Sequence, residues 1–90
     1  MNTLALNSLR VGQSAYVSEI EADPAMRRRL LDIGLIQGTK VTCMAKSPAG
    51  DPAAYLIRGA VIALRGGDAR GVRMERPSPA RGFDRQAVLA

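Results

Sequence analysis

The hydrophobic pattern over residues 24–33 predicts one short α-helix. Asp23 is a suitable N-cap, and Pro24 then falls at the first helical position, where its missing N–H has no partner to lose. The apolar side chains of this segment recur at helical spacing, on one face: Met26, Leu30 and Ile33. Gly34 suits the left-handed position that ends a helix, and Leu35 beyond it can contact the last turn. Both helix ends and the apolar stripe therefore support the same helix, residues 24–33.

Short strands are predicted on both sides of this helix. Residues 40–46 alternate between apolar and polar side chains, which predicts a half-buried strand with Val41, Cys43 and Ala45 on its buried face. The other strand candidates are residues 14–21, 54–58, 60–65 and 71–76. Gly59 indicates a tight hairpin, and residues 66–69 read as a turn. Short, closely spaced strands with one helix are typical of a small, mainly β barrel of about five strands.

A change in composition divides the chain near residue 77. The 90 residues are enough for one compact domain, which we expect over residues 1–76. Pro77 and Pro79 interrupt the last strand, and Arg81-Gly82 follows them. We therefore expect residues 77–90 to form a flexible C-terminal tail.

The charge balance favours an acidic binding partner. The chain has eleven arginines and two lysines, with a net charge of +5. The densest basic run is Arg27–Arg29, on the predicted helix. Three readings of this run stay open: a solvated helix face, docking onto an acidic protein surface, or phosphate contacts with RNA or DNA. With aromatic residues at 3% of the chain, little surface is left for base stacking, so protein docking ranks first and a basic barrel binding RNA or DNA is the alternative.

Residues suited to catalysis or metal binding are scarce. Histidine is absent, which removes the commonest general base and a common transition-metal ligand. Cys43 is the only cysteine, and its place on an apolar strand face predicts a buried structural thiol. Asp51 and Asp68 lie beside glycines in turns, where aspartate usually bonds the backbone of its own turn. We therefore expect no enzymatic activity, no cofactor, and no catalytic, cofactor-binding or metal-binding residue.

The cellular compartment follows from two further features. A single cysteine excludes an intramolecular disulfide and fits a reducing environment. The longest uncharged stretch, residues 1–9, is far shorter than the roughly 20 apolar residues needed to cross a bilayer. We expect a soluble, cytoplasmic protein that reaches a membrane only through a partner.

Four segments together resemble the ferrous iron transport protein A (FeoA) family. Residues 29–38 are similar to its helix-end signature, and residues 47–52 to its P-x-G-D-P loop. The other two matching segments are residues 60–69, which resemble a family strand and turn, and Leu6–Gly12, which resemble the family's first motif. The matches keep the family's order and spacing over residues 4–76. Gln37 stands where the family usually has proline.

This resemblance implies an SH3-like barrel and a role in ferrous iron uptake. It implies a non-enzymatic, cytoplasmic accessory protein that acts by protein–protein contact with a FeoB-like membrane permease, which imports Fe(II) and carries a GTP-binding domain. Transition-metal binding is a label that belongs to this pathway, and we expect no stable iron site, because surface carboxylates alone would hold Fe(II) weakly. We expect the partner-binding surface around the helix and the turn after it: Arg27, Arg28, Leu31, Leu35 and Gln37. For Leu31, core packing and exposure to a partner are equally compatible with the pattern.

Overall fold

The computed structural model describes residues 3–76. The predicted tail, residues 77–90, lies outside the described residues. Within residues 3–76, no helix is long and apolar enough to cross a membrane.

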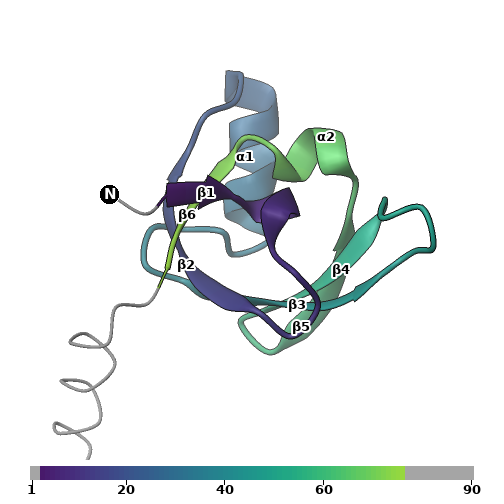
Figure 1. Ribbon diagram of the computed structural model, residues 1–90. Helices are drawn as coiled ribbons and strands as arrows, with labels where there is room; N and C mark the ends of the chain where they lie inside the picture. Colours follow the sequence, from purple (N-terminus) through teal and green to yellow (C-terminus); the bar gives the residue numbers. More distant parts are fainter. Residues whose placement is uncertain (1–2, 77–90) are drawn as a thin grey trace, which may run out of the picture.

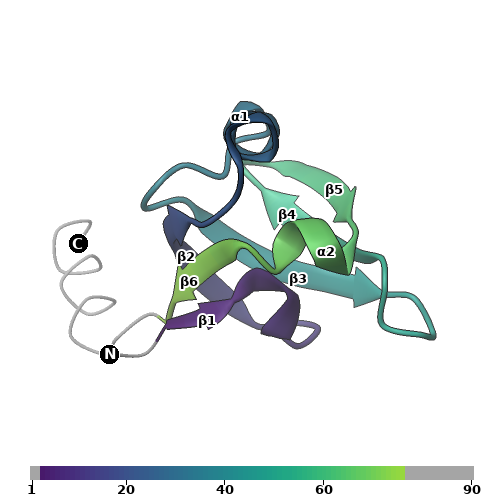
Figure 2. The ribbon, with the colours of Figure 1, turned by 90° about the horizontal axis from the view of Figure 1, so that it is seen from above.

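Six antiparallel strands form one sheet in the order β1-β6-β2-β3-β4-β5 (Figure 1). The strands are β1 Thr3–Ala5, β2 Ser14–Ile20, β3 Lys40–Lys46, β4 Ala53–Ile57, β5 Ala60–Leu64 and β6 Val72–Glu75. The sheet curls around a common core, as the two perpendicular views show (Figures 1 and 2). The predicted fold class, a mainly β barrel with one short helix, is confirmed. The strand additional to the expected five is β1, which pairs with β6.

Three helical segments join the strands. Helix α1, Pro24–Asp32, lies where the sequence predicts it. The Asp23 carboxylate accepts a hydrogen bond from the Met26 N–H at 2.9 Å, which caps its first turn. The predicted turn at residues 66–69 is instead a short helix, α2 Gly66–Ala69, and a 3-10 turn, η1 Leu6–Ser8, follows β1.

The C-terminal end of α1 has the expected glycine cap. Gly34 has a φ of +106°, a left-handed conformation that glycine adopts without a Cβ clash. The Leu35 N–H donates to the Leu30 carbonyl oxygen at 3.1 Å, so the chain turns back over the last turn of the helix. This closure directs Leu35 into the core.

The core is aliphatic apart from one tyrosine. Its buried side chains come from every strand from β2 to β6, from η1 and from both helices: Leu6, Leu9, Ala15, Val17, Ile20, Leu30, Leu35, Val41, Cys43, Ala53, Tyr55, Ile57, Leu64, Ala69, Val72 and Met74. No charged side chain of the described residues is buried. The thiol of Cys43 has no exposed area, which confirms the predicted buried cysteine.

One prediction within β3 is wrong. Val41 and Cys43 are buried as expected, but Ala45 is exposed. The pairing of β3 with β4 shifts between Cys43 and Ala45, so Met44 is an extra residue in the ladder. A β-bulge of this kind reverses the inward and outward alternation beyond it. The bulge therefore moves Ala45 to the outer face.

Candidate docking surface

Helix α1 presents one buried edge and one exposed face. Leu30 is buried, and Met26 and Ile33 are half-buried against the core. The opposite face carries Arg28 and Leu31, and the Leu31 side chain is 37% exposed. Leu31 is therefore only partly packed, and its contact with a partner stays a prediction.

A shallow depression of about 410 Å³ lies on this face. It is lined by Pro24, Arg27, Arg28, Leu31 and Asp32. Its lining combines two apolar residues, Pro24 and Leu31, with two arginines and one aspartate. Apolar centres with polar rims are the usual anatomy of a protein–protein contact. We name the depression, together with Ile36 and Gln37 in the following turn, the α1 surface.

The two arginines of the α1 surface differ in what they contact. The Arg27 guanidinium donates to the backbone carbonyl of Ile20 at 3.2 Å, which ties α1 to the end of β2. Arg28 makes no ion pair or side-chain hydrogen bond with any described residue. Arg28 is therefore free to meet a partner, whereas Arg27 already has a structural role.

Leu35 does not belong to this surface. Its side chain has no exposed area, because the glycine cap turns it into the core. The predicted partner-binding role of Leu35 is therefore wrong. Gln37 is exposed as expected, and its turn is fixed by the hydrogen bond from the Gly38 N–H to the Val17 carbonyl at 2.8 Å.

Sequence reasoning missed two residues near this surface. Ile36 is 42% exposed, although its apolar side chain favours a buried position. Arg58 lies over Gly34, where an added Cβ would come within 2.8 Å of the Arg58 Cδ. The side chain of Arg58 thereby reaches the C-terminal end of α1, where a cation is favourable. No local signal in the sequence predicts this long-range contact.

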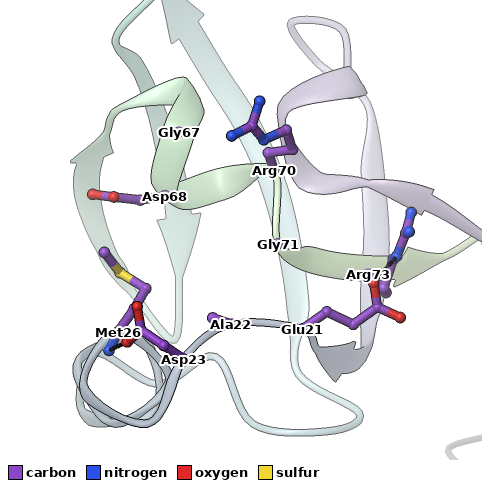
Figure 3. Close-up of a pocket in the computed structure, with 9 residues that line it drawn as sticks. All are labelled: Glu21, Ala22, Asp23, Met26, Gly67, Asp68, Arg70, Gly71 and Arg73. Carbon is purple, nitrogen blue, oxygen red and sulfur yellow. Dashed lines mark hydrogen bonds and ion pairs between the residues drawn. The ribbon is translucent and has the colours of Figure 1, made fainter.

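A second hollow, of about 390 Å³, separates the start of α1 from the segment between α2 and β6 (Figure 3). Three carboxylates line it, but two are already engaged. Asp23 caps α1, and Glu21 pairs with Arg73 at 3.0 Å. The third, Asp68, is half-buried, and Arg70 points away from the Glu21–Arg73 pair (Figure 3). Within residues 3–76, no three acidic or cysteine side chains are arranged to hold a metal ion.

The remaining polar groups have structural roles. The Asp51 carboxylate accepts a hydrogen bond from the Gly66 N–H at 2.8 Å, so the prediction that Asp51 bonds its own turn is wrong. Burial, with smaller contributions from Cys43 and Asp51, raises the pKa of Tyr55 to about 12. Tyr55 therefore stays protonated at neutral pH and is no candidate base.

The nucleic-acid alternative gains no support from this geometry. Of the two tyrosines among the described residues, Tyr55 is buried and Tyr16 is half-buried, so neither offers a full ring face. Arg27 and Arg73 are held by contacts within the chain. Single-strand binding usually relies on exposed aromatic rings beside a basic groove.

Known proteins share both this sequence and this fold. A fusion of Fe(2+) transport protein A with the Fe(2+) transporter FeoB, from Porphyromonas gingivalis, is 29% identical over 72 residues; the match covers 80% of the chain and 8% of the fusion protein. The FeoA-like protein of Clostridium acetobutylicum superposes with a TM-score of 0.78 at 29% identity, covering 84% of the chain and 88% of that protein.

A further solved structure identifies the fold type. FeoA of Stenotrophomonas maltophilia, described as a prokaryotic SH3 domain protein and determined with zinc, has a TM-score of 0.72 at 30% identity. That match covers 80% of the chain and 89% of the relative. The model of the FeoA domain matches residues 4–76, most of the chain. The chain therefore belongs to the FeoA domain family and has its SH3-like fold.

Proposed function

We propose that this protein is an accessory of ferrous iron transport that acts by contact with a FeoB-like permease. The observation that carries the proposal is the Porphyromonas gingivalis fusion, in which a related domain and the transporter FeoB share one polypeptide. Fusion keeps two parts at a high effective concentration, which is useful where they work in contact. A separate chain needs a docking surface to achieve the same proximity.

The α1 surface is the best candidate for this contact. Leu31 and Ile36 are the exposed large hydrophobic residues of α1 and the turn after it, at 37% and 42% exposure. Arg28 lines the same depression as Leu31 and makes no ion pair or hydrogen bond with the described residues. We expect the permease to offer an apolar side chain to Leu31 and a carboxylate to Arg28.

The proposed action is modulation of transport without chemistry in this chain. Fe(II) is the cargo of the permease, and the accessory protein would alter gating or GTP hydrolysis by binding. This assignment places the protein on the cytoplasmic side, at the membrane only through its partner.

Binding to the whole permease tests the proposal. The full-length FeoB-like permease is reconstituted in nanodiscs, and its affinity for the accessory protein is measured by biolayer interferometry. Leu31→Asp should weaken binding about tenfold or more, because it places a charge at the centre of the contact. Val11→Asp is the matched control, since Val11 is 59% exposed on the turn before β2. The proposal would be contradicted if the wild-type chain did not bind the permease, or if Leu31→Asp bound it as tightly as the wild type does.

A further inference from the structure

Strand β5 ends the sheet with an uncharged, apolar edge. It pairs with β4 on one side only and is the outermost strand there (Figure 2). Its five residues are Ala-Val-Ile-Ala-Leu, and β4 beside it also carries no charge. Val61 is 61% exposed, the most exposed large apolar side chain among the described residues.

The turn between β4 and β5 fixes which backbone groups face outward. Arg58 and Gly59 have positive φ values of 52° and 86°, as in a two-residue hairpin turn of the mirror-image type. In such a hairpin the flanking residues, Ile57 and Ala60, exchange hydrogen bonds, and every second pair does so after them. The backbone N–H and C=O groups of Val61 and Ala63 therefore point away from β4, and no described residue bonds them.

The residues of the edge carry none of the sequence features that protect against added strands. Protected edges carry a proline, a bulge or a charge, or are covered by another element. The register of β5 with β4 is continuous from Ala60 to Leu64, and none of its residues is proline or charged. An edge of this kind is a template for a further strand.

A cleft beside the edge can receive a side chain. It has a volume of about 160 Å³ and lies between α1 and β5. Its lining residues come from the helix, from the strand and from α2: Met26, Arg29, Leu30 and Ile33, then Ile62, Ala63 and Leu64, and Asp68. A strand added to β5 would project alternate side chains toward this inner side. Most of its lining side chains are apolar, with Arg29 and Asp68 beside them, and its volume suits one aliphatic side chain.

Charges at the two ends of the strand decide between a second copy and another protein. Arg58 precedes β5 and Arg65 follows it, and both are exposed. Two copies could pair antiparallel with Ile62 of one copy opposite Ile62 of the other. In this register Gly59 of one copy lies opposite Arg65 of the other, and Arg58 of the first copy lies next to that Arg65. This brings like charges together at both ends, which disfavours self-pairing. An extended segment with acidic residues at its ends has the opposite charge pattern.

We propose that the β5 edge binds an extended segment of another protein by strand addition. The segment would bond to the backbone of Val61 and Ala63, insert one aliphatic side chain into the cleft, and set its acidic ends against Arg58 and Arg65. This site is separate from Arg28 and Leu31 of the α1 surface. It stands whether or not the partner of the α1 surface is the permease.

The test uses the full chain and a synthetic probe. The probe is a short blocked peptide of alternating threonine and valine with a glutamate at each end. Amide NMR and hydrogen exchange should show slowed exchange at Val61 and Ala63, by about tenfold or more at saturation. Val61→Lys should abolish this protection, whereas Val11→Lys, a valine with nearly the same exposure at 59% against 61%, should retain it. Arg58→Asn and Arg65→Gln should each weaken the peptide about two- to fivefold.

Other results would overturn the proposal. They are an absence of binding, binding unaffected by Val61→Lys, or protection at β1, the opposite edge of the sheet. A dimer detected by sedimentation without peptide, and lost in Val61→Lys, would assign the edge to a second copy instead. Leu31→Asp should leave peptide binding unchanged, so failure at the β5 edge and failure of the permease contact can be told apart.

Discussion

The Asp51 carboxylate caps helix α2 from a loop that precedes it by fifteen residues. Its Oδ1 accepts a hydrogen bond from the Gly66 N–H at 2.8 Å, and Gly66 is the first residue of α2. The residue at the N-cap position itself, Arg65, makes no side-chain cap. Asp51 thus supplies a cap that the local sequence lacks, and it links the two segments, residues 47–52 and 60–69, that resemble family motifs.

Removal of this carboxylate should destabilise the fold. Asp51→Ala leaves the Gly66 N–H without its acceptor, and we expect a loss of about 1 kcal/mol in the free energy of unfolding. Asp51→Asn keeps an acceptor oxygen and should lose less. Urea denaturation measures both, with Asp32→Ala as a control, because Asp32 is exposed and makes no hydrogen bond with the described residues. Equal stability of Asp51→Ala and the wild type would show that the cap contributes nothing.

Two glycines near α2 should respond oppositely to alanine. A Cβ at Gly71 would lie 2.5 Å from the Glu21 carbonyl oxygen, so Gly71→Ala must push two backbone segments apart. The overpacking should cost about 1–3 kcal/mol. Gly67 lies within α2 and has open space around its Cα, so Gly67→Ala should stabilise by about 0.5–1 kcal/mol. Thermal unfolding of both variants checks the pair, and a stable Gly71→Ala would contradict the close approach.

Stability should fall at alkaline pH because of Tyr55. Its pKa is raised from 10.0 to about 12 in the folded chain, so the folded state holds this proton more tightly than the unfolded state. The contribution is complete below pH 10 and is lost as the pH rises from about 10 to about 12, by on the order of 2 kcal/mol. Tyr55→Phe should remove this part of the pH dependence in urea denaturation. An unchanged profile in Tyr55→Phe would show that another group is responsible.

Substitutions of the two neighbouring arginines of α1, Arg27 and Arg28, should have different effects on stability and on permease binding. Arg27→Ala removes the hydrogen bond to the Ile20 carbonyl and should cost up to about 1 kcal/mol of stability. Arg28→Ala removes no ion pair or hydrogen bond with the described residues and should change stability by less than about 0.5 kcal/mol. In the nanodisc assay, Arg28→Ala should still weaken permease binding. If Arg28→Ala matched the wild type in binding, Arg28 would not be part of the contact.

Local signals in the sequence predict most of the fold. The bounds of α1 follow from Asp23 and Gly34, since a cap acts within one helical turn. Strict alternation is a local pattern, and it predicts β3 over the range that the strand occupies, Lys40–Lys46. These features depend only on neighbours in sequence.

The errors arise where distant residues decide the outcome. Ala45 lies outside because of a bulge against β4, and Asp51 bonds Gly66, which lies in a different turn. Leu35 is apolar and follows the helix, so its sequence fits both a core and a surface position. Only the packing of the glycine cap against the core excludes the surface position. The location of the docking surface therefore stays a prediction, and burial removes Leu35 from it.

A two-dimensional amide NMR titration tests the proposed docking most directly. The labelled full chain is titrated with the soluble GTP-binding domain of the FeoB-like permease, and in parallel with the whole permease in nanodiscs. We expect chemical-shift changes or line broadening centred on Arg28, Leu31, Ile36 and Gln37, and their loss in Leu31→Asp. Wild-type spectra unchanged by both forms of the permease, or changes confined to residues outside the α1 surface, would contradict the proposed docking.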